Sequence, residues 1–261
     1  METTLSADGT RLAYDVRGDG PVLVYVTGAI CFRQFRPVLA DVKAFAAEFT
    51  VYTYDRRGRG DSGDTLPYSV DREIEDIEAI IDAAGGTAHI YGHSSGAVLA
   101  LEAALRIPDK IDRVVIYDAS YVHAEQERDS YSALSRKIGH LLERGENGRA
   151  IKQFLRGIGM PRPFVELLPL MPGWKTMKAL APTLMYDIAM TENLPPLDRL
   201  RGIKLPVQVT VGQRSPSSLL AVARAVAEAI PGAEYQVLDG QDHMVSPKAL
   251  LPILTHALLK S

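Results

Sequence analysis

The stretch Gly92-His93-Ser94-Ser95-Gly96 has the residue types and spacing of a nucleophilic serine site. It follows the apolar run Ala88 to Tyr91 and precedes another apolar run, so the predicted order is strand, sharp turn, helix. In that context the pattern G-x-S-x-G indicates a nucleophile elbow, which exposes the serine hydroxyl above the sheet. An anion that forms beside Ser94 would meet amide donors at the start of the helix. The alternative is a glycine-rich turn without chemistry.

A serine nucleophile needs a base to take its proton, and the base needs an anion to hold its tautomer. We predict His243 as the base, because its loop, 238–244, comes between the last predicted strand and the last predicted helix. A loop there can reach back over the edge of the sheet to Ser94. The other histidines fit less well, because they fall in a predicted strand, in the elbow itself, at position 123 or in helical stretches: His89, His93, His123, His140 and His256.

The elements that must position these residues alternate between strands and helices along the chain. Apolar runs predict strands, and apolar spacing from Val70 to Ile81 predicts one helix face that ends at Gly85-Gly86. A hairpin is expected before residue 17, and a helix is expected after each of Pro216 and Pro247. This alternation favours a parallel sheet covered on both faces. The predicted strands are Val22 to Val26, Phe49 to Tyr54, Ala88 to Tyr91, Arg113 to Tyr117, Val207 to Val211 and Tyr235 to Leu238.

The alternation stops between residues 121 and 200, a stretch rich in proline and methionine. We interpret residues 121–200 as a helical lid inserted into a core made of residues 1–120 and 201–261. Methionine is flexible and polarisable, so it suits an adaptable apolar pocket, although it could equally fill the lid's own core. The residues that we expect to line a substrate pocket are His123, Trp174, Met185 and Met244.

The composition disfavours a nucleic-acid-binding, a membrane-spanning or a secreted protein. Apolar residues make up 46% of the 261 residues, enough for one large core, and the formal net charge is -3. Without a long basic run we expect no nucleic-acid partner. No apolar run approaches the length of a membrane span, and the polar start Met1-Glu2-Thr3-Thr4 has no signal-peptide pattern. We therefore expect a cytoplasmic protein without a membrane partner, and we derive no oligomeric state.

Metal and cofactor chemistry also lack a sequence signal. The single cysteine, Cys31, excludes an intramolecular disulfide and a cysteine zinc cage. Neither a spacing such as His-Glu-x-x-His nor a Walker-type loop occurs, so we expect no metal and no cofactor. The densest basic cluster lies in the loop 55–62, where acids flank three arginines. We predict that local ion pairs to Asp55 and Asp61 hold this loop as a structural element.

Taken together, the chain resembles the lid-bearing α/β-hydrolases. The resemblance rests on Val22 to Gly28, the loop 55–62, the elbow 92–96 and the loop 239–243. It implies an α/β fold with a mostly parallel eight-stranded sheet and helices on both faces. It also implies Ser94 as nucleophile, His243 as base, and an oxyanion hole formed by the backbone amides of Ala29 and Ser95. Thr27 departs from the histidine common in the family, but a backbone donor does not depend on that side chain.

The acid of the triad is the main departure from the family pattern. Ser215 stands where the family places an aspartate after the strand that follows the lid, and a hydroxyl cannot stabilise an imidazolium as a carboxylate does. We favour Asp118, at the end of the strand that follows the elbow helix, as the acid. Asp118 could instead only cap the start of the lid. Asp239 and Asp242 are less suitable, the latter because an adjacent side chain points away from its neighbour's ring.

These residues predict a serine hydrolase that cleaves an ester, lactone or related acyl bond of a small, fairly apolar substrate through an acyl-enzyme. Serine at position 94 disfavours epoxide hydrolase and dehalogenase chemistry, because those relatives need an aspartate there. One alternative is a lyase, acyltransferase or cyclase that uses the same site without water. The other is a ligand-binding protein with a degenerate triad, since loss of the acid costs about 10⁴ in kcat.

Overall fold

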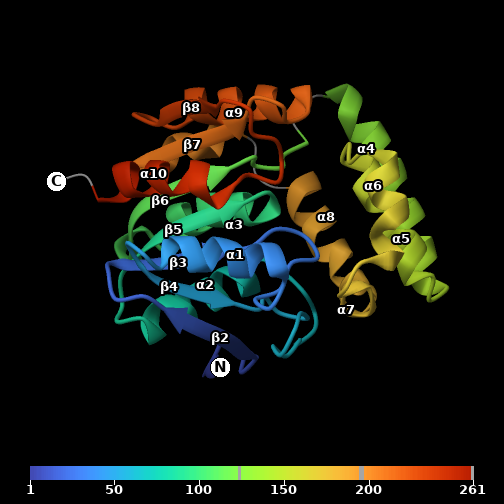
Figure 1. The fold of residues 1–261 in the computed structure, drawn as a ribbon, viewed down its shortest axis with the longest axis horizontal. Coiled ribbons are helices and arrows are strands. Elements are labelled where there is room, and N and C mark those ends of the chain that lie inside the picture. The colour runs from blue at the N-terminus through green and yellow to red at the C-terminus, as the bar shows by residue number, and fades with distance from the viewer. Residues whose placement is uncertain (123–124, 194–196, 260–261) are drawn as a thin grey trace.

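The computed structural model describes residues 1–122, 125–193 and 197–259. Within these ranges eight strands form one sheet, in the order β1-β2-β4-β3-β5-β6-β7-β8 (Figure 1). Strand β2 pairs antiparallel with β1 and β4, and all the other pairs are parallel. The strands are β1 (Glu2–Leu5), β2 (Arg11–Arg17), β3 (Val22–Val26), β4 (Thr50–Tyr54), β5 (Ala88–His93), β6 (Ile111–Tyr117), β7 (Val207–Gly212) and β8 (Glu234–Leu238).

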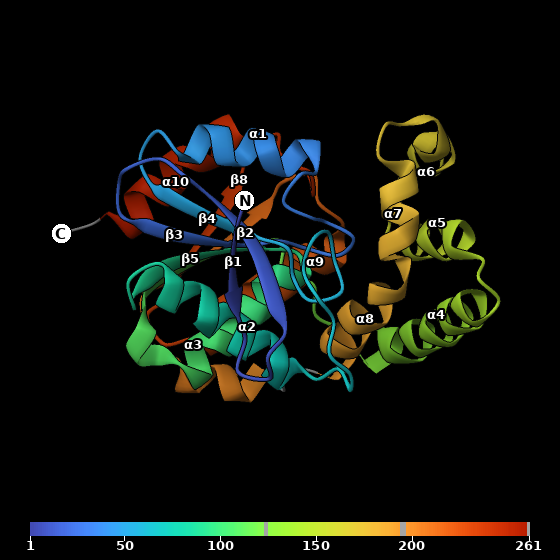
Figure 2. The same cartoon turned by 90° about the horizontal axis from the view of Figure 1, so that it is seen from below.

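Helices cover both faces of the sheet, as Figure 2 shows with the sheet between two helical layers. On one face lie α1 (Arg36–Phe45) and α10 (Pro247–Leu258), and on the other α2 (Val70–Ala83), α3 (Ser95–Arg106) and α9 (Ser217–Ala229). Strand β3 explains the arrangement, because successive side chains of a strand point to opposite faces. Leu23 and Tyr25 join the core under α1, whereas Val24 and Val26 join the core under α3. The expected mostly parallel eight-stranded α/β fold is therefore confirmed.

The sequence predicted the strands of this core to within a residue or two, but it missed helix α1. That helix starts at Arg36-Pro37, with proline in the first turn, and buries Val38, Val42 and Phe45. Val38, Val42 and Phe45 follow the helical spacing i, i+4, i+7, so the sequence does carry a local signal for this helix. Short 3-10 helices complete the chain at Pro108–Lys110, Leu168–Leu170, Ala181–Thr183 and Leu197–Gly202.

A group of helices that comes between β6 and β7 in the chain stands beside the sheet, at the right of Figures 1 and 2. We call α4 to α8 the helical segment. It has its own apolar cluster, which includes Ile151, Phe154 and Leu184 and which Ile30 of the core joins. The segment consists of α4 (Glu125–Glu143), α5 (Asn147–Gly157), α6 (Arg162–Leu167), α7 (Trp174–Leu180) and α8 (Leu184–Asn193).

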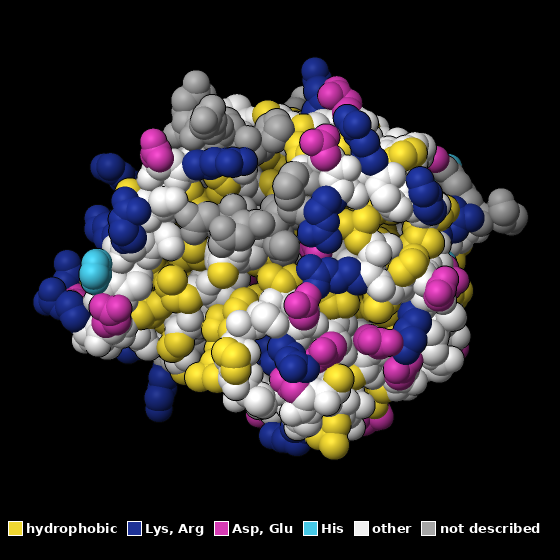
Figure 3. All heavy atoms as spheres, turned by 180° about the vertical axis from the view of Figure 1, so that it is seen from behind, with side chains coloured by type: hydrophobic (Ala, Val, Ile, Leu, Met, Phe, Trp, Pro, Cys, Tyr) yellow, Lys and Arg dark blue, Asp and Glu magenta, His cyan; other side chains and the backbone are white. Residues whose placement is uncertain are grey.

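The surface carries charged side chains of both signs. On the face seen from behind, Lys and Arg side chains are interspersed with Asp and Glu (Figure 3). None of the helices in the described ranges combines the length and the apolar character that a membrane crossing requires.

Candidate active site

Ser94 lies at the sharp turn between β5 and α3. Its backbone has φ 57° and ψ -122°, a conformation that L-residues rarely adopt and that needs support from its surroundings. A Cβ on Gly92 would stand 2.6 Å from the Gly96 carbonyl oxygen, and one on Gly96 would stand 2.2 Å from the Val26 carbonyl oxygen. The turn therefore requires both glycines, as expected for an elbow that presses a helix against its strand.

Asp118 and His243 are in direct contact. Nδ1 of His243 lies 2.9 Å from Oδ2 of Asp118, which is fully buried at the end of β6. The same carboxylate accepts hydrogen bonds from the Ser215 hydroxyl at 2.6 Å and the Gly212 amide at 3.1 Å. Because β6 lies between β5 and β7, a carboxylate at its end can reach an imidazole that approaches the elbow. Ser215 thus donates a hydrogen bond to the carboxylate and does not take its place.

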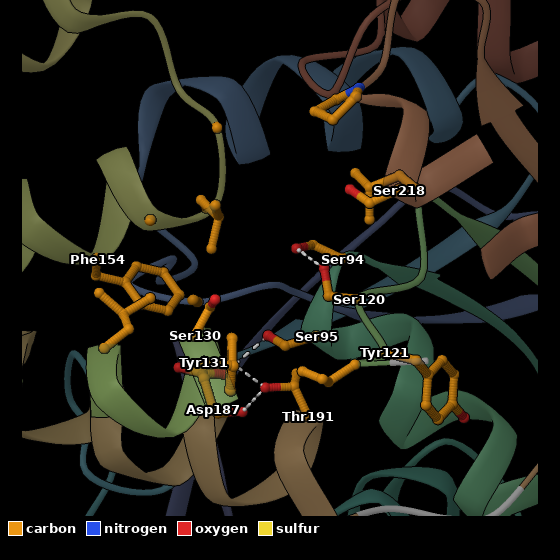
Figure 4. Close-up of a pocket in the computed structure, with 18 of the residues that line it drawn as sticks. Ser94, Ser95, Ser120, Tyr121, Ser130, Tyr131, Phe154, Asp187, Thr191 and Ser218 are labelled. Atoms are coloured by element: carbon orange, nitrogen blue, oxygen red, sulfur yellow. Dashed lines mark hydrogen bonds between the residues drawn. The ribbon is translucent and has the colours of Figure 1, made fainter. Parts of the chain in front are cut away.

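Ser94 and His243 line the same two cavities, which meet at the elbow. The Ser94 hydroxyl has its hydrogen bond with the Ser120 hydroxyl, at 3.1 Å (Figure 4). In the part of the chain that the structure describes, no hydrogen bond joins Ser94 to His243. The contact of Nδ1 with Asp118 leaves Nε2 of His243 available for a second partner.

Ala29 and Ser95, the expected oxyanion donors, both line the larger cavity beside Ser94. A Cβ on Gly28 would stand 3.0 Å from Cβ of Ser94, so the loop after β3 packs directly on the elbow. Among the described residues, no acceptor takes a hydrogen bond from the backbone amide of Ala29 or of Ser95. Two amides beside one hydroxyl can stabilise an oxyanion.

The side chain of Ser95 contacts a buried cluster of charges. Its hydroxyl donates to Asp187 of α8 at 2.8 Å, and Asp187 also pairs with Arg56 at 2.9 Å and with Arg59 at 2.7 Å. Burial raises the pKa of Asp187, but the guanidinium groups of Arg59 and Arg56 outweigh burial and hold that pKa below its ordinary value. The carboxylate is therefore charged and ties the helical segment to the elbow.

We expected local ion pairs within the loop 55–62, and this expectation is wrong. Asp55 and Asp61 pair with Arg33, whereas Arg57 pairs with Asp76 of α2. The physical reason is that these arginines are fully buried, and the acids that reach them there come from α2, from α8 and from the turn at Asp8.

The arginines of this loop also hold the backbone that carries the expected oxyanion donor. Arg59 donates to the Gly28 carbonyl at 2.7 Å, and Arg56 donates to the Thr27 carbonyl at 3.3 Å. The loop 55–62 is therefore a support for the site as well as for the fold.

His93 holds the loop that carries His243. Nε2 of His93 donates to the His243 carbonyl oxygen at 2.9 Å, and the two rings lie 5.0 Å apart between centroids. Burial and the neighbouring His243 lower the pKa of His93 to about 4, so this ring is neutral at pH 7. The hydroxyl of Tyr117 donates to the Asp242 carbonyl at 2.6 Å and fixes the same loop.

The structure separates the four residues that were expected to line a substrate pocket. Met244 lines the smaller cavity. Trp174 and Met185 line neither cavity and instead pack into the apolar cluster of the helical segment. His123 lies outside the described residues. Trp174 and Met185 therefore belong to the core of the helical segment and not to a substrate pocket.

Two polar residues that contact the elbow serines were not found by the sequence analysis, Ser120 and Asp187. Nothing in the sequence marks Ser120. Asp187 is the only charged residue between Leu184 and Met190, and an isolated acid in an apolar helical turn is a signal for a buried partner. Within the described ranges no group of three or more His, Cys, Asp or Glu side chains is arranged to hold a metal ion.

Comparison with known proteins places this geometry among related folds. The model of the alpha/beta hydrolase family matches residues 23–251. A crystal structure of an alpha/beta hydrolase from Sphaerobacter thermophilus DSM 20745 is 39% identical, with a TM-score of 0.88, and the match covers 98% of this chain and 100% of that one.

Two further relatives carry functional names. The enol-lactonase from Burkholderia xenovorans LB400 is 20% identical with a TM-score of 0.78 over 99% of this chain and 100% of that chain, a likeness of fold. The putative carbamate hydrolase RutD of Caulobacter segnis is 40% identical over 79 residues, which are 29% of this chain. The chain spans only 30% of the length of that curated relative.

Proposed function

The chain belongs to the alpha/beta hydrolase family, and from this premise we propose that it is a serine hydrolase that cleaves an ester, lactone or related acyl bond. The observation that carries the proposal is the contact of Asp118 with Nδ1 of His243, at 2.9 Å, in a loop that lines the same cavities as Ser94. A carboxylate on Nδ1 holds the imidazole in the tautomer whose Nε2 accepts a proton.

In the proposed mechanism, the Ser94 hydroxyl exchanges its hydrogen bond with Ser120 for one with Nε2 of His243. His243 takes the proton as Ser94 Oγ attacks the acyl carbon, and the negative charge develops on the carbonyl oxygen. The amides of Ala29 and Ser95 stabilise that oxygen. His243 then protonates the leaving group. In the second half of the reaction, His243 takes a proton from water as the water attacks the acyl carbon, and it returns the proton to Ser94 Oγ as the acid product leaves.

The cavities support a small to medium, fairly apolar substrate. The larger one has a volume of about 660 Å³, within the range usual for small-molecule sites, and places the elbow serines opposite Phe154 (Figure 4). The names of the relatives, a lactonase and a putative carbamate hydrolase, are compatible with acyl chemistry of this kind. We further propose that residues 121–200 act as a lid, since α5 supplies lining residues to both cavities.

A fluorophosphonate probe tests the nucleophile. We expect a single covalent adduct, mapped to Ser94 by peptide mass, and no adduct on Ser94→Ala or on the heat-denatured chain. We also expect hydrolysis of p-nitrophenyl acetate, which Ser94→Ala reduces by at least about 10⁴. An unlabelled wild-type chain at high probe concentration would instead support the ligand-binding alternative.

Labelled water separates hydrolysis from the lyase, transferase or cyclase alternative. If water is the acceptor, the acid product formed in H₂¹⁸O carries one ¹⁸O from solvent. Product without the label, with ester still consumed, would show that the acyl group goes to another acceptor.

A further inference from the structure

The smaller cavity, which we call the apolar chamber, shares Ser94 and His243 with the larger one. It has a volume of about 250 Å³ and extends between the helical segment and helix α1. Its walls are mostly hydrophobic, with Phe35 and Val38 on the side of the core and Phe154, Leu168 and Met171 on the side of the helical segment. Such a chamber suits the hydrocarbon part of an acyl group.

The wall of the apolar chamber nonetheless contains a polar group of three side chains, Tyr25, Asp41 and Tyr91. Tyr25 and Tyr91 are register partners on β3 and β5, so both point to the face that α1 covers, and their rings lie 4.9 Å apart. The hydroxyl of Tyr25 donates to Oδ2 of Asp41 at 2.9 Å. We call these three residues the polar end of the chamber.

Hydrogen-bonding capacity at the polar end is left unused. The Tyr91 hydroxyl is fully buried and has no hydrogen-bond partner in the described part of the chain. Asp41 is half-buried, and among the described residues no cation pairs with it and no donor other than Tyr25 reaches its carboxylate. Burial raises the pKa of Asp41 to about 7, and the hydrogen bond from Tyr25 opposes this shift. A buried hydroxyl without a partner, such as that of Tyr91, is costly and rare in native proteins and calls for an explanation.

We propose that the polar end is a subsite for a hydrogen-bond-donating group, a hydroxyl or an ammonium, at the far end of the substrate's acyl chain. The inference rests on the proposed acyl chemistry at Ser94. The donor would bind the free oxygen of Asp41, and the Tyr91 hydroxyl would bind the same group. The walls of the chamber would enclose the methylenes between this group and the acyl carbon.

Strand geometry sets the length of chain that fits. Tyr91 precedes Ser94 by three residues, so its Cα lies roughly 10 Å back along β5. An extended acyl chain of about eight carbons covers such a distance, because each C–C bond of about 1.5 Å advances the chain by roughly 1.3 Å. Esters with a shorter acyl group would fill the junction of the two cavities without reaching Asp41.

The test compares p-nitrophenyl esters of octanoic, 8-hydroxyoctanoic and 8-aminooctanoic acid, each as a ratio of kcat/KM to the octanoyl ester. For the wild-type chain we expect at least one of the two substituted esters to be preferred by about tenfold or more, the effect of one well-made hydrogen bond in a buried site. Asp41→Leu should bring both ratios below one, because it removes the acceptor. Asp41→Asn keeps an acceptor without the charge, so it should retain a hydroxyl preference and abolish an ammonium preference.

Tyr91→Phe should lower the preferred ratio by a few fold, and Tyr54→Phe is its matched control. The Tyr54 hydroxyl is also fully buried without a described partner, but Tyr54 lines neither cavity. Because each variant is read as a ratio between two esters, a general loss of activity cancels. Wild-type ratios near or below one, or ratios that Asp41→Leu leaves unchanged, would overturn the subsite. A chain that fails to cleave even p-nitrophenyl acetate would instead overturn the proposed function.

Discussion

The two cavities that meet at Ser94 differ in how the acid beside each of them is paired. Beside the larger cavity, Asp187 is paired with two arginines and the Ser95 hydroxyl, and apart from Nε of Arg59 the charged atoms there have partners. In the apolar chamber, Asp41 has one neutral hydrogen bond and no described cation, and the Tyr91 hydroxyl has no described partner. A satisfied cluster holds parts of the protein in place, whereas a polar group without a partner keeps hydrogen-bonding capacity that a ligand can use.

The largest expected effect concerns Asp118, which contacts His243 where the two cavities meet. Asp118→Asn should reduce kcat for p-nitrophenyl acetate by about 10² to 10⁴, because the amide no longer stabilises the imidazolium of His243. Ser215→Ala is the matched control and should change kcat by less than about tenfold, since it removes one of three hydrogen bonds to the carboxylate. If Ser215→Ala proves the crippling change, the assignment of Asp118 is wrong.

The paired cluster should be sensitive to loss of its central acid. Asp187→Asn leaves Arg59 and Arg56 buried with one negative charge fewer, and we expect the free energy of unfolding to fall by about 3–5 kcal/mol. Urea denaturation measures the change. Glu166→Gln is the control, because this exposed acid also contacts two cations, Lys152 and Arg156, and should cost at most about 1 kcal/mol. Equal losses of stability for the two variants would show that Asp187 stabilises the protein no more than an exposed acid does.

Replacement of Asp41, which no described cation contacts, should stabilise the protein at high pH. The pKa of Asp41 is raised by burial from 3.8 to about 7, so between these values the folded state binds more protons than the unfolded state. Its contribution to the free energy of unfolding is therefore fully present below pH 4 and is lost as the pH rises through 7. Asp41→Asn cannot ionise, so it should be more stable than the wild type at pH 8 and gain nothing at pH 4.

The magnitude of that gain is at most a few kcal/mol, since one pKa unit corresponds to about 1.4 kcal/mol. Denaturation of both proteins at pH 4, 6 and 8 gives the difference directly. The thiol of Cys31, which also lines the chamber, does not titrate in this window because burial raises its pKa to about 11. A stability difference that stays constant with pH would show that the pKa of Asp41 is not raised in the folded protein.

The smallest expected effect concerns Ser120. Its hydroxyl is the hydrogen-bond partner of the Ser94 hydroxyl, a place that Nε2 of His243 takes in the proposed mechanism. Ser120→Ala removes this bond, and we expect kcat/KM for p-nitrophenyl acetate to rise by a few fold, the scale of one exposed hydrogen bond. Ser130→Ala, on the rim of the same cavity, serves as the control. A large fall in kcat/KM would mean that Ser120 orients the nucleophile in the reaction.

Much of the core was accessible from the sequence because its signals are local. The elbow 92–96 needs glycines at two places where a Cβ would collide with backbone, and those positions are visible as letters. Buried strands such as Val22–Val26 appear as continuous apolar runs, because both faces of a parallel sheet are covered. Helix α1 was missed although Val38, Val42 and Phe45 lie at helical spacing, which is a local signal of the same kind.

The sequence by itself determined the fold class, the elbow at Ser94 and the choice of Asp118 and His243 as candidates, because each rests on short-range pattern or on chain order. Only the tertiary structure decided that His243 contacts Asp118, that Ser215 donates to the same carboxylate, and that the buried arginines of the loop 55–62 pair with Asp187 and Asp76 in place of their neighbours. It alone brought Asp41 and Tyr91 to one chamber wall. Such partnerships join residues tens of positions apart, and the packing of helices on a sheet selects them.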